Sequence, residues 1–262
     1  MSELPHLDVS RPATSRVYAG LADGKDLFAT DRKIVEAVRA VIPGIGHAVR
    51  ANCVFLREAV ATLTRDHGIT QVLDLGAGLP DAEMNLHDVA HEHAPHARIV
   101  YVDHDPMVVV HWRARLNHAG TAVVHGDALR PAQIMAAAEV TELIDFSRPV
   151  ALVMGALTHF WPDDVLPGVL GSYLAALAPG SALVFSHATT DKLSAETVAV
   201  AVKAYGMPIY PRSGTQIRAL LSRLKPLAPG VVAVRDWPVN DTLDRGYPPV
   251  LLGGVAFTRS GA

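Results

Sequence analysis

The sequence predicts an α/β protein built on a doubly wound, mostly parallel sheet. Five short apolar segments alternate with helical patterns between residues 69 and 204. The apolar segments are rich in valine and leucine and almost uninterrupted, which is typical of parallel strands buried on both faces. The 262 residues are 50% hydrophobic, so the chain has enough apolar side chains for a full core. A purely helical pattern precedes this region, and we expect it to form a lid.

The alternating segments define five β–α units. The expected strands are residues 71–75, 98–102, 122–125, 150–154 and 182–186, and the expected helices are residues 81–93, 106–117, 131–138, 163–177 and 195–204. Two later strand-like runs, residues 231–234 and 250–257, are joined by a loop that contains proline and aspartate. We expect these runs to form an antiparallel hairpin that closes one edge of the sheet.

The chain is expected to divide near Gly68. Residues 1–68 would form an N-terminal arm and helical lid, and residues 69–262 the sheet domain. Within the lid, Thr30 is the expected N-cap of a helix over residues 31–41. Gly68 is expected to end a longer helix over residues 46–67.

Charge and cysteine content exclude several kinds of partner. The net charge of −3 argues against a broad basic face for nucleic acid. No uninterrupted apolar stretch approaches the roughly 20 residues that span a bilayer, and the N-terminus lacks the apolar region of a secretory signal. The single cysteine, Cys53, excludes a disulfide framework and suits a reducing compartment. We therefore expect a cytoplasmic protein that binds neither nucleic acid nor a membrane.

The clearest local motif is the glycine loop VLDLGAGLPD, residues 72–81, which includes the end of the first strand. Its candidate ligand-binding residues are Asp74, Gly76, Ala77 and Gly78. Glycines let a ligand approach the backbone closely, and the helix predicted to follow would offer unpaired N–H donors. The third glycine of the dinucleotide fingerprint is replaced by Asp81, whose charge disfavours a pyrophosphate. The motif therefore favours a positively charged ligand over NAD or FAD, although tight turns also use glycine for structural reasons.

The next three strands also end in acidic residues or glycine. Asp103 ends the second, Asp127 follows the third and Gly155 follows the fourth. In an open α/β sheet, ligands bind beyond the carboxyl ends of the strands. Asp103 could accept hydrogen bonds from both hydroxyls of a ribose, and Asp127 could accept one from an adenine amino group. Each acid alone is more often a turn or N-cap residue, but their repetition at successive strand ends indicates a nucleoside site.

With these motifs, the sequence resembles the Rossmann-type S-adenosylmethionine-dependent methyltransferases. More narrowly, it resembles an actinobacterial methyltransferase family with an added N-terminal helical segment. The segments that carry the resemblance are residues 15–32, 50–60, 72–80, 100–106, 148–164, 177–189 and 250–257. The resemblance implies a seven-stranded sheet with one antiparallel strand, and S-adenosylmethionine as the cofactor. The chain departs from the family pattern at residues 22–26 and 80–87, so the resemblance does not extend to a substrate.

The resemblance also implies roles for individual residues. Asp74, Gly76 and Gly78 would line the methionine part of the cofactor, and Gly155 and Ala156 would run past its sulfonium. Asp103 would hold the ribose, with His104 beside the adenine. Asp127 and Ala128 would flank the adenine edge. In the lid, Tyr18, Lys25 and Arg50 form a polar set with Asp26 and Asn52. Arg50 could pair with the cofactor carboxylate, or this set could be solvated helix surface.

His159 is the candidate catalytic base, because it follows the fourth strand and neutral imidazole can accept a proton near pH 7. The alternative is that it only packs against Trp161. Among the 13 histidines, His87 and His91 have a helical spacing that can hold zinc. Asp88 replaces the glutamate of the H-E-x-x-H motif, so surface histidine is the preferred interpretation and no metal is expected.

The leading hypothesis is an enzyme that methylates oxygen or nitrogen of a small organic molecule, such as a secondary metabolite. A second hypothesis keeps the cofactor site without methyl transfer, as in a cofactor-binding protein or an isomerase or cyclase. A nicotinamide oxidoreductase is the third, and Asp81 disfavours it. The sequence leaves the oligomeric state open.

Overall fold

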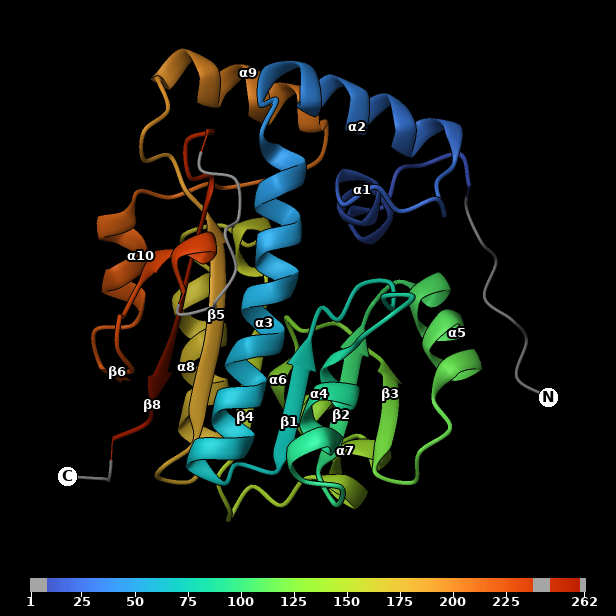
Figure 1. Ribbon diagram of the computed structural model, residues 1–262, viewed down its shortest axis with the longest axis vertical. Helices are drawn as coiled ribbons and strands as arrows, with labels where there is room; N and C mark the ends of the chain where they lie inside the picture. Colours follow the sequence, from blue (N-terminus) through green and yellow to red (C-terminus); the bar gives the residue numbers. More distant parts are fainter. Residues whose placement is uncertain (1–8, 238–245, 260–262) are drawn as a thin grey trace.

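The computed structural model describes residues 9–237 and 246–259. It confirms an α/β fold with a mostly parallel sheet, in the order β3-β2-β1-β4-β5-β8-β6, with β7 beside β8 (Figure 1). The strands are β1 (Gln71–Leu75), β2 (Arg98–Asp103), β3 (Thr121–His125), β4 (Ala151–Met154), β5 (Ala182–Ala188), β6 (Lys225–Pro226), β7 (Val232–Ala233) and β8 (Leu251–Phe257). The five predicted parallel strands are all present, because their almost continuous apolar side chains are buried on both faces.

The edge of the sheet is antiparallel, as the tail of the sequence predicts. β8 pairs antiparallel with both β5 and β7. The sheet contains eight strands within the described residues, where seven were expected. The additional strand is the two-residue β6, which also pairs with β8. A strand of two residues is too short to produce a recognisable sequence pattern, so it was not predicted.

Helices cover both faces of the sheet. Those of the sheet region are α4 (Leu86–His93), α5 (Pro106–Arg115), α6 (Pro131–Met135), α7 (Ala138–Leu143), α8 (Leu166–Ala176), α9 (Ala195–Tyr205) and α10 (Gly214–Leu220). Helices α4 and α5 pack on one face with the C-terminal part of α3 (Ile45–His67), and helices α6, α7, α8 and α10 contribute to the core on the other face. Neighbouring side chains of β1 separate between the two cores, with Val72 in one and Leu73 in the other. The sheet is therefore doubly wound.

The N-terminal helices form a layer beyond the carboxyl ends of the strands. Helices α1 (Thr14–Leu21) and α2 (Ala29–Val41) share a small core with the start of α3 and the end of α9 (Figure 1). Helix α3 therefore belongs to two cores, since Val49 packs in the lid and Phe55 packs on the sheet. The proposed division at residue 68 stays a prediction, and the shared helix argues for a continuous body.

The start of α2 differs from the prediction. Thr30 lies inside the helix, and the N-cap position belongs to Phe28. The carboxylate of Asp31 accepts a hydrogen bond from the Phe28 backbone N–H at 2.9 Å. Asp31 also accepts one from the Ala13 backbone N–H and forms a buried ion pair with Arg16. A contact with a residue distant in sequence therefore fixes where this helix begins.

Gly68 ends α3 in the left-handed conformation, as predicted. Within the described ranges, no helix is both long and apolar enough to cross a membrane.

Candidate active site

The glycine loop after β1 is held tightly against β2. The backbone N–H groups of Gly76 and Ala77 both donate to the Val102 carbonyl, at 2.8 and 3.0 Å. Gly76 has a φ of 69°, and a Cβ there would lie 2.6 Å from Leu157 Cδ1. Glycine is therefore favoured at position 76, chiefly because of its left-handed conformation, and a Cβ would also displace the Leu157 side chain. The loop brings bare backbone to the carboxyl end of β1, as a ligand cradle requires.

Asp103 connects this loop to the end of β2. Its carboxylate accepts hydrogen bonds from the backbone N–H groups of Gly78 and Asp105, each at 2.9 Å. Burial raises its pKa, while these two N–H donors act in the opposite direction. Asp103 therefore orients the glycine loop as well as lying where a ribose was expected.

Asp74 is the least satisfied acid of the site. Asp74 is 7% exposed, yet its side chain has no hydrogen-bond partner among the described residues. Burial, and then the nearby charge of Asp103, raise the pKa of Asp74 to about 8. A buried carboxyl group without a partner costs stability unless a ligand supplies a positive charge or a donor. The position therefore suits a cationic ligand.

The helix after the glycine loop starts later than predicted. Helix α4 begins at Leu86, not at Asp81, because Asn85 and Asp88 form its capping box. Asp81 instead makes a turn, in which its side chain accepts a hydrogen bond from the Glu83 backbone N–H at 2.8 Å. The residues between Gly76 and Asn85 are therefore loop, and the donors of α4 are not part of the cradle.

The predicted adenine residues lie beyond β2 and β3. His104 is largely exposed, and its Nδ1 atom lies 3.6 Å from Asp103 Oδ1. Asp127 Oδ1 accepts a hydrogen bond from the Leu129 backbone N–H at 2.9 Å, so this acid also caps a turn. The Ala128 carbonyl accepts one from the Tyr173 hydroxyl at 3.0 Å, which anchors the loop to α8.

The loop after β4 is equally constrained. A Cβ at Gly155 would lie 2.5 Å from Leu56 Cδ1, so α3 packs directly on this backbone. Ala156 has a φ of 50°, an uncommon conformation for a residue with a Cβ. The Ser186 hydroxyl accepts a hydrogen bond from the Ala156 N–H at 2.8 Å and helps to hold this conformation. Backbone strain at a fixed position beside the glycine loop fits a ligand contact.

His159 lies in the short 3₁₀ helix η1 (Thr158–Phe160), just beyond β4. It is buried, and its Nδ1 accepts a hydrogen bond from the Ala188 backbone N–H at 3.3 Å. Burial, and then His187 and Arg212, lower its pKa well below the ordinary value, so the ring is neutral. With Nδ1 accepting, the ring proton lies on Nε2. The resting side chain therefore offers a donor, and its role as a base stays a prediction.

Arg212 fixes the loop that carries His159. Its guanidinium donates to the Trp161 carbonyl at 2.8 Å, to His187 Nε2 at 2.7 Å and to Asp163 Oδ1 at 2.8 Å. The arginine is 4% exposed, so its contacts with Trp161 and His187 form away from water, whereas Asp163 lies at the surface. No sequence motif predicts this role, because Arg212 is distant along the chain from every motif and reaches η1 only through the fold.

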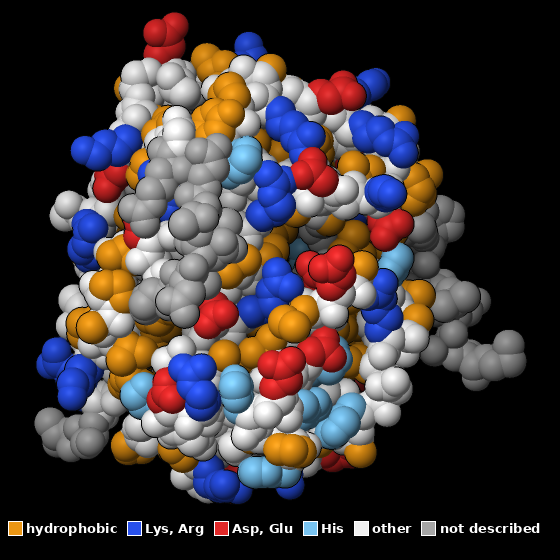
Figure 2. All heavy atoms as spheres, viewed as in Figure 1, with side chains coloured by type: hydrophobic (Ala, Val, Ile, Leu, Met, Phe, Trp, Pro, Cys, Tyr) orange, Lys and Arg blue, Asp and Glu red, His pale blue; other side chains and the backbone are white. Residues whose placement is uncertain are grey.

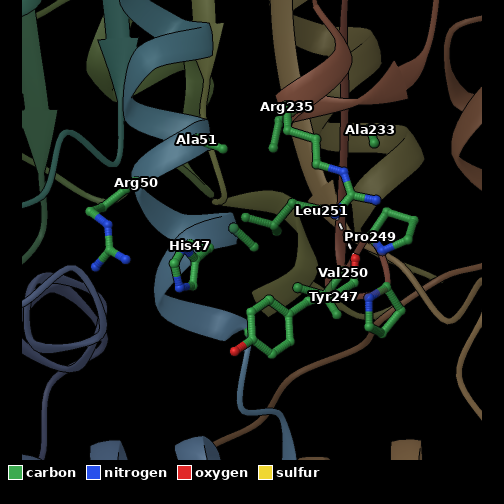
Figure 3. A pocket seen from close by; sticks show the side chains of 13 residues that line it. His47, Arg50, Ala51, Ala233, Arg235, Tyr247, Pro249, Val250 and Leu251 are labelled. Atoms are coloured by element: carbon green, nitrogen blue, oxygen red, sulfur yellow. Dashed lines mark hydrogen bonds between the residues drawn. The ribbon is translucent and has the colours of Figure 1, made fainter. Parts of the chain in front are cut away.

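The polar residues of the lid do not form a single group. Tyr18 is half-buried, and its hydroxyl accepts a hydrogen bond from Asn52 Nδ2 at 2.7 Å. Arg50 is half exposed and forms an ion pair with Asp23, whereas Lys25 is exposed. In Figure 3, Arg50 points away from Tyr247 and towards α1. The geometry thus leaves the assignment of Arg50 and Lys25 to a cofactor as a prediction.

Helix α1 contacts the sheet directly at the end of β2. The Ser15 hydroxyl donates to Asp105 Oδ2 at 2.8 Å, and Arg16 NH1 lies 4.0 Å from the same oxygen. Figure 2 shows the molecule hollowed beside α3, between the lid helices and the strand ends, with charged side chains around the opening. The lid therefore covers the edge of the sheet where the glycine loop lies.

The histidine pair on α4 is engaged by the protein. His87 Nδ1 lies 2.8 Å from the hydroxyl of Tyr101, whose ring stacks on Trp112. His91 Nε2 lies 3.0 Å from the Ala97 carbonyl. Across the residues that the structure describes, no three metal-ligating side chains gather into a group that could hold a metal ion.

Comparison with known proteins gives the family. The S-adenosyl methyltransferase family matches residues 2–258. The chain belongs to this family. A candidate methyltransferase from Thermobifida fusca is 34% identical, with a TM-score of 0.90 over 99% of both chains. A DUF574 family protein from Streptomyces avermitilis is 32% identical, with a TM-score of 0.91 over 97% of this chain and 100% of the other. No curated protein matches the chain.

Family membership gives the enzyme class. The protein is an S-adenosylmethionine-dependent methyltransferase with a Rossmann-like fold, as the sequence predicts. The glycine loop and the ends of β1, β2 and β4 lie where such a fold binds its ligand.

Proposed function

We propose that the protein transfers a methyl group from S-adenosylmethionine to oxygen or nitrogen of a small organic molecule. The main support for the cofactor site is Asp74, a buried acid that has no hydrogen-bond partner among the described residues. S-adenosylmethionine carries an ammonium group and a sulfonium, and either charge would stabilise the ionised carboxylate. The acid therefore fits this cofactor better than a dinucleotide.

The other predicted residues extend the same site. The loop of Gly76, Ala77 and Gly78 would lie against the methionine part, and the carboxylate of Asp103 would accept hydrogen bonds from the ribose hydroxyls. The proposed contacts at the adenine are His104, Asp127 and Ala128, those beside the sulfonium are Gly155 and Ala156, and those from the lid are Tyr18, Lys25 and Arg50. These assignments rest on the family and on the position of each residue at a strand end or in the lid.

The bound cofactor would supply an activated methyl group: the acceptor's lone pair forms a bond to the methyl carbon as the C–S bond breaks, the electron pair stays on sulfur, and the acceptor loses its proton. The protein aligns the acceptor and excludes water. His159 is the candidate to receive that proton, which would require its Nε2 to be unprotonated. A cytoplasmic, reducing setting remains the expectation from the single cysteine.

Thermal unfolding with added ligands tests the cofactor. A ligand at 100 times its Kd stabilises the folded state by about 2.7 kcal/mol, which raises the Tm of a chain of this size by roughly 5–10 °C. We expect such shifts with S-adenosylmethionine and with its demethylated product, and none with NAD. A shift with NAD alone would overturn the proposal.

Methyl transfer needs a second measurement, because a cofactor-binding protein or an isomerase would give the same thermal shift. Release of S-adenosylhomocysteine can be followed with a panel of phenols, alcohols and amines. Acceptor-dependent release supports the methyltransferase. Strong cofactor binding without release for any acceptor would favour the non-methylating alternative.

A further inference from the structure

A cavity lies under the lid, beside His159. It has a volume of about 100 Å³ and is bounded by α1, α2, the start of α3, α9 and the residues that follow β5. Apolar side chains dominate its wall, among them Leu21, Val38, Val49, Val198 and Val202. The cavity thus lies between the lid and the carboxyl end of β5, beside the short helix η1 that carries His159.

The wall of this cavity carries no charge. None of the described residues that line it is Asp, Glu, Lys or Arg. Its titratable groups are Tyr18, Tyr205 and His159. Burial raises the pKa of both tyrosines, and burial lowers the pKa of the histidine, so all three are neutral at physiological pH. A charged molecule entering the cavity would lose its water without gaining an opposite charge, which costs several kcal/mol.

The cavity nevertheless has a polar end. His159 Nδ1 is used by the Ala188 backbone N–H, and Nε2 has no hydrogen-bond partner among the described residues. In this tautomer Nε2 carries the proton and can donate it to an oxygen in the cavity. Thr189 also lines this end; its hydroxyl accepts a hydrogen bond from the Asp191 backbone N–H at 3.1 Å and keeps its own proton to donate.

We propose that this cavity binds the methyl acceptor, and that the acceptor is an uncharged, largely apolar molecule with an oxygen that accepts a hydrogen bond from His159 Nε2. That the ligand is a methyl acceptor rests on the proposed function. That it is uncharged and largely apolar follows from the residues that line the cavity. This binding mode assigns His159 the task of positioning the acceptor oxygen, and in this tautomer the ring cannot also receive the acceptor's proton at Nε2. It also excludes carboxylates, phosphates and quaternary amines as the buried part of the acceptor.

A matched pair of fluorescent dyes tests the charge of the ligand. N-phenyl-1-naphthylamine is uncharged, and 1-anilinonaphthalene-8-sulfonate has the same rings with a sulfonate. We expect the uncharged dye to bind at least tenfold more tightly, with similar affinity between pH 6 and pH 9. Equal affinity for the two dyes, or tighter binding of the sulfonate, would overturn the proposal.

Two neighbouring substitutions on α9 locate the dye. Ala201 lines the cavity, whereas Val200 is 46% exposed and does not. Ala201→Phe should fill the space and weaken N-phenyl-1-naphthylamine binding at least tenfold, and Val200→Phe should change it less than twofold. If Ala201→Phe does not fold, Ala201→Leu gives the same comparison with a smaller side chain. Unchanged binding in a folded Ala201 variant would place the dye elsewhere and refute the assignment.

The uncharged ketone dye prodan tests whether His159 Nε2 donates a hydrogen bond to a ligand in the cavity. His159→Leu should weaken its binding about five- to tenfold and shift its bound emission to the blue, because the carbonyl loses a hydrogen bond. His159→Gln keeps an N–H near the Nε2 position and should restore both properties, although glutamine cannot act as a base. Failure of the glutamine to restore either property would contradict the donor role.

The dye measurements and the cofactor shifts can fail independently. If S-adenosylmethionine gives no thermal shift, the proposed function fails while the dyes still decide the class of ligand. If the cofactor binds and the dyes do not discriminate, this inference fails and the proposed function stands.

Discussion

At the scale of single residues, Asp74 shows how a ligand site costs stability. A carboxyl group at the end of a buried strand could have been a leucine or an asparagine with a partner. Here it lies near a second acid, Asp103, and has no hydrogen bond to any described residue. Such an arrangement lowers the stability of the ligand-free protein and becomes favourable when a cation binds. Ala156, in the next loop along the sheet edge, also costs stability, because its φ of 50° is unfavourable for a residue with a Cβ.

The raised pKa of Asp74 leads to a prediction about pH. Its folded-state pKa is about 8, above its ordinary value of 3.8, so its contribution to stability is complete below about pH 4 and is lost as pH rises towards 8. Asp74→Asn cannot ionise and should raise the Tm of the ligand-free protein, by about 2–4 °C or more at pH 8 and by less at pH 5. The same variant should lose most of the thermal shift caused by S-adenosylmethionine.

The exposed Asp164 provides the control for this measurement. Asp164→Asn should leave the Tm within about 1 °C at both pH values, as for most surface substitutions. A gain for Asp74→Asn that is equal at pH 5 and pH 8, or a lower Tm, would show that the acid is not a destabilising group.

At the scale of elements, the lid is fixed by one buried ion pair. Asp31 on α2 joins Arg16 of α1 at 2.7 Å and caps two backbone N–H groups, and Arg16 also lies over the Phe28 ring. The exposed Asp23 makes a superficially similar pair of contacts, with Arg39 and Arg50. Exposed pairs contribute little to stability, whereas breaking a buried pair leaves a charge without compensation.

These two aspartates give a matched prediction. Asp31→Asn should lower the free energy of unfolding by about 3 kcal/mol and increase hydrogen exchange in α1 and α2. Asp23→Asn should cost less than about 1 kcal/mol, and asparagine tolerates the positive φ at that position. Urea unfolding and exchange mass spectrometry measure both effects. Similar losses for the two variants would mean that the lid does not depend on the Arg16–Asp31 pair.

At the scale of the whole molecule, α3 joins the lid to the sheet. Its first turns pack with α1 and α2, and its later turns cover β4, β5 and β8, so one helix belongs to both cores. Arg50 lies at this junction, and it is the residue that would reach the cofactor carboxylate if the ion pair with Asp23 opens.

This junction carries the prediction for Arg50. Arg50→Ala should weaken S-adenosylmethionine binding at least tenfold by calorimetry, because a charge-assisted contact to a carboxylate is lost. Arg39→Ala removes the other arginine from Asp23 and should leave affinity within about twofold, which controls for the lost surface pair. Unchanged affinity in Arg50→Ala would remove this residue from the cofactor site.

Much of the fold could be predicted from the sequence, because its signals are local. The apolar run of residues 71–75 matches β1 residue for residue, since every one of its side chains is buried. Helix α4 could not be placed as well, because Asp81 and Asn85 form a turn whose hydrogen bonds compete with helix formation. Helix α10 was not predicted at all.

The candidate site divides in the same way. Asp74 and Asp103 are candidate ligand residues because they lie in the last two positions of apolar strands, a pattern that the sequence shows, and their role stays a prediction. Their charge states were not predictable, because a pKa depends on burial and on neighbours from other strands. The same holds for His159, whose tautomer depends on the Ala188 N–H donated from β5.

The sequence by itself determined the parallel sheet, the glycine loop, the acids at the strand ends and, through these, the methyltransferase family. These features depend on residues that are neighbours along the chain, and hydrophobic periodicity and turn chemistry act over that range. Only the tertiary structure decided that Arg212 holds the His159 loop and that Asp31 holds the lid. Only the tertiary structure revealed the uncharged cavity under the lid, because the residues that line it come from helices far apart in the sequence.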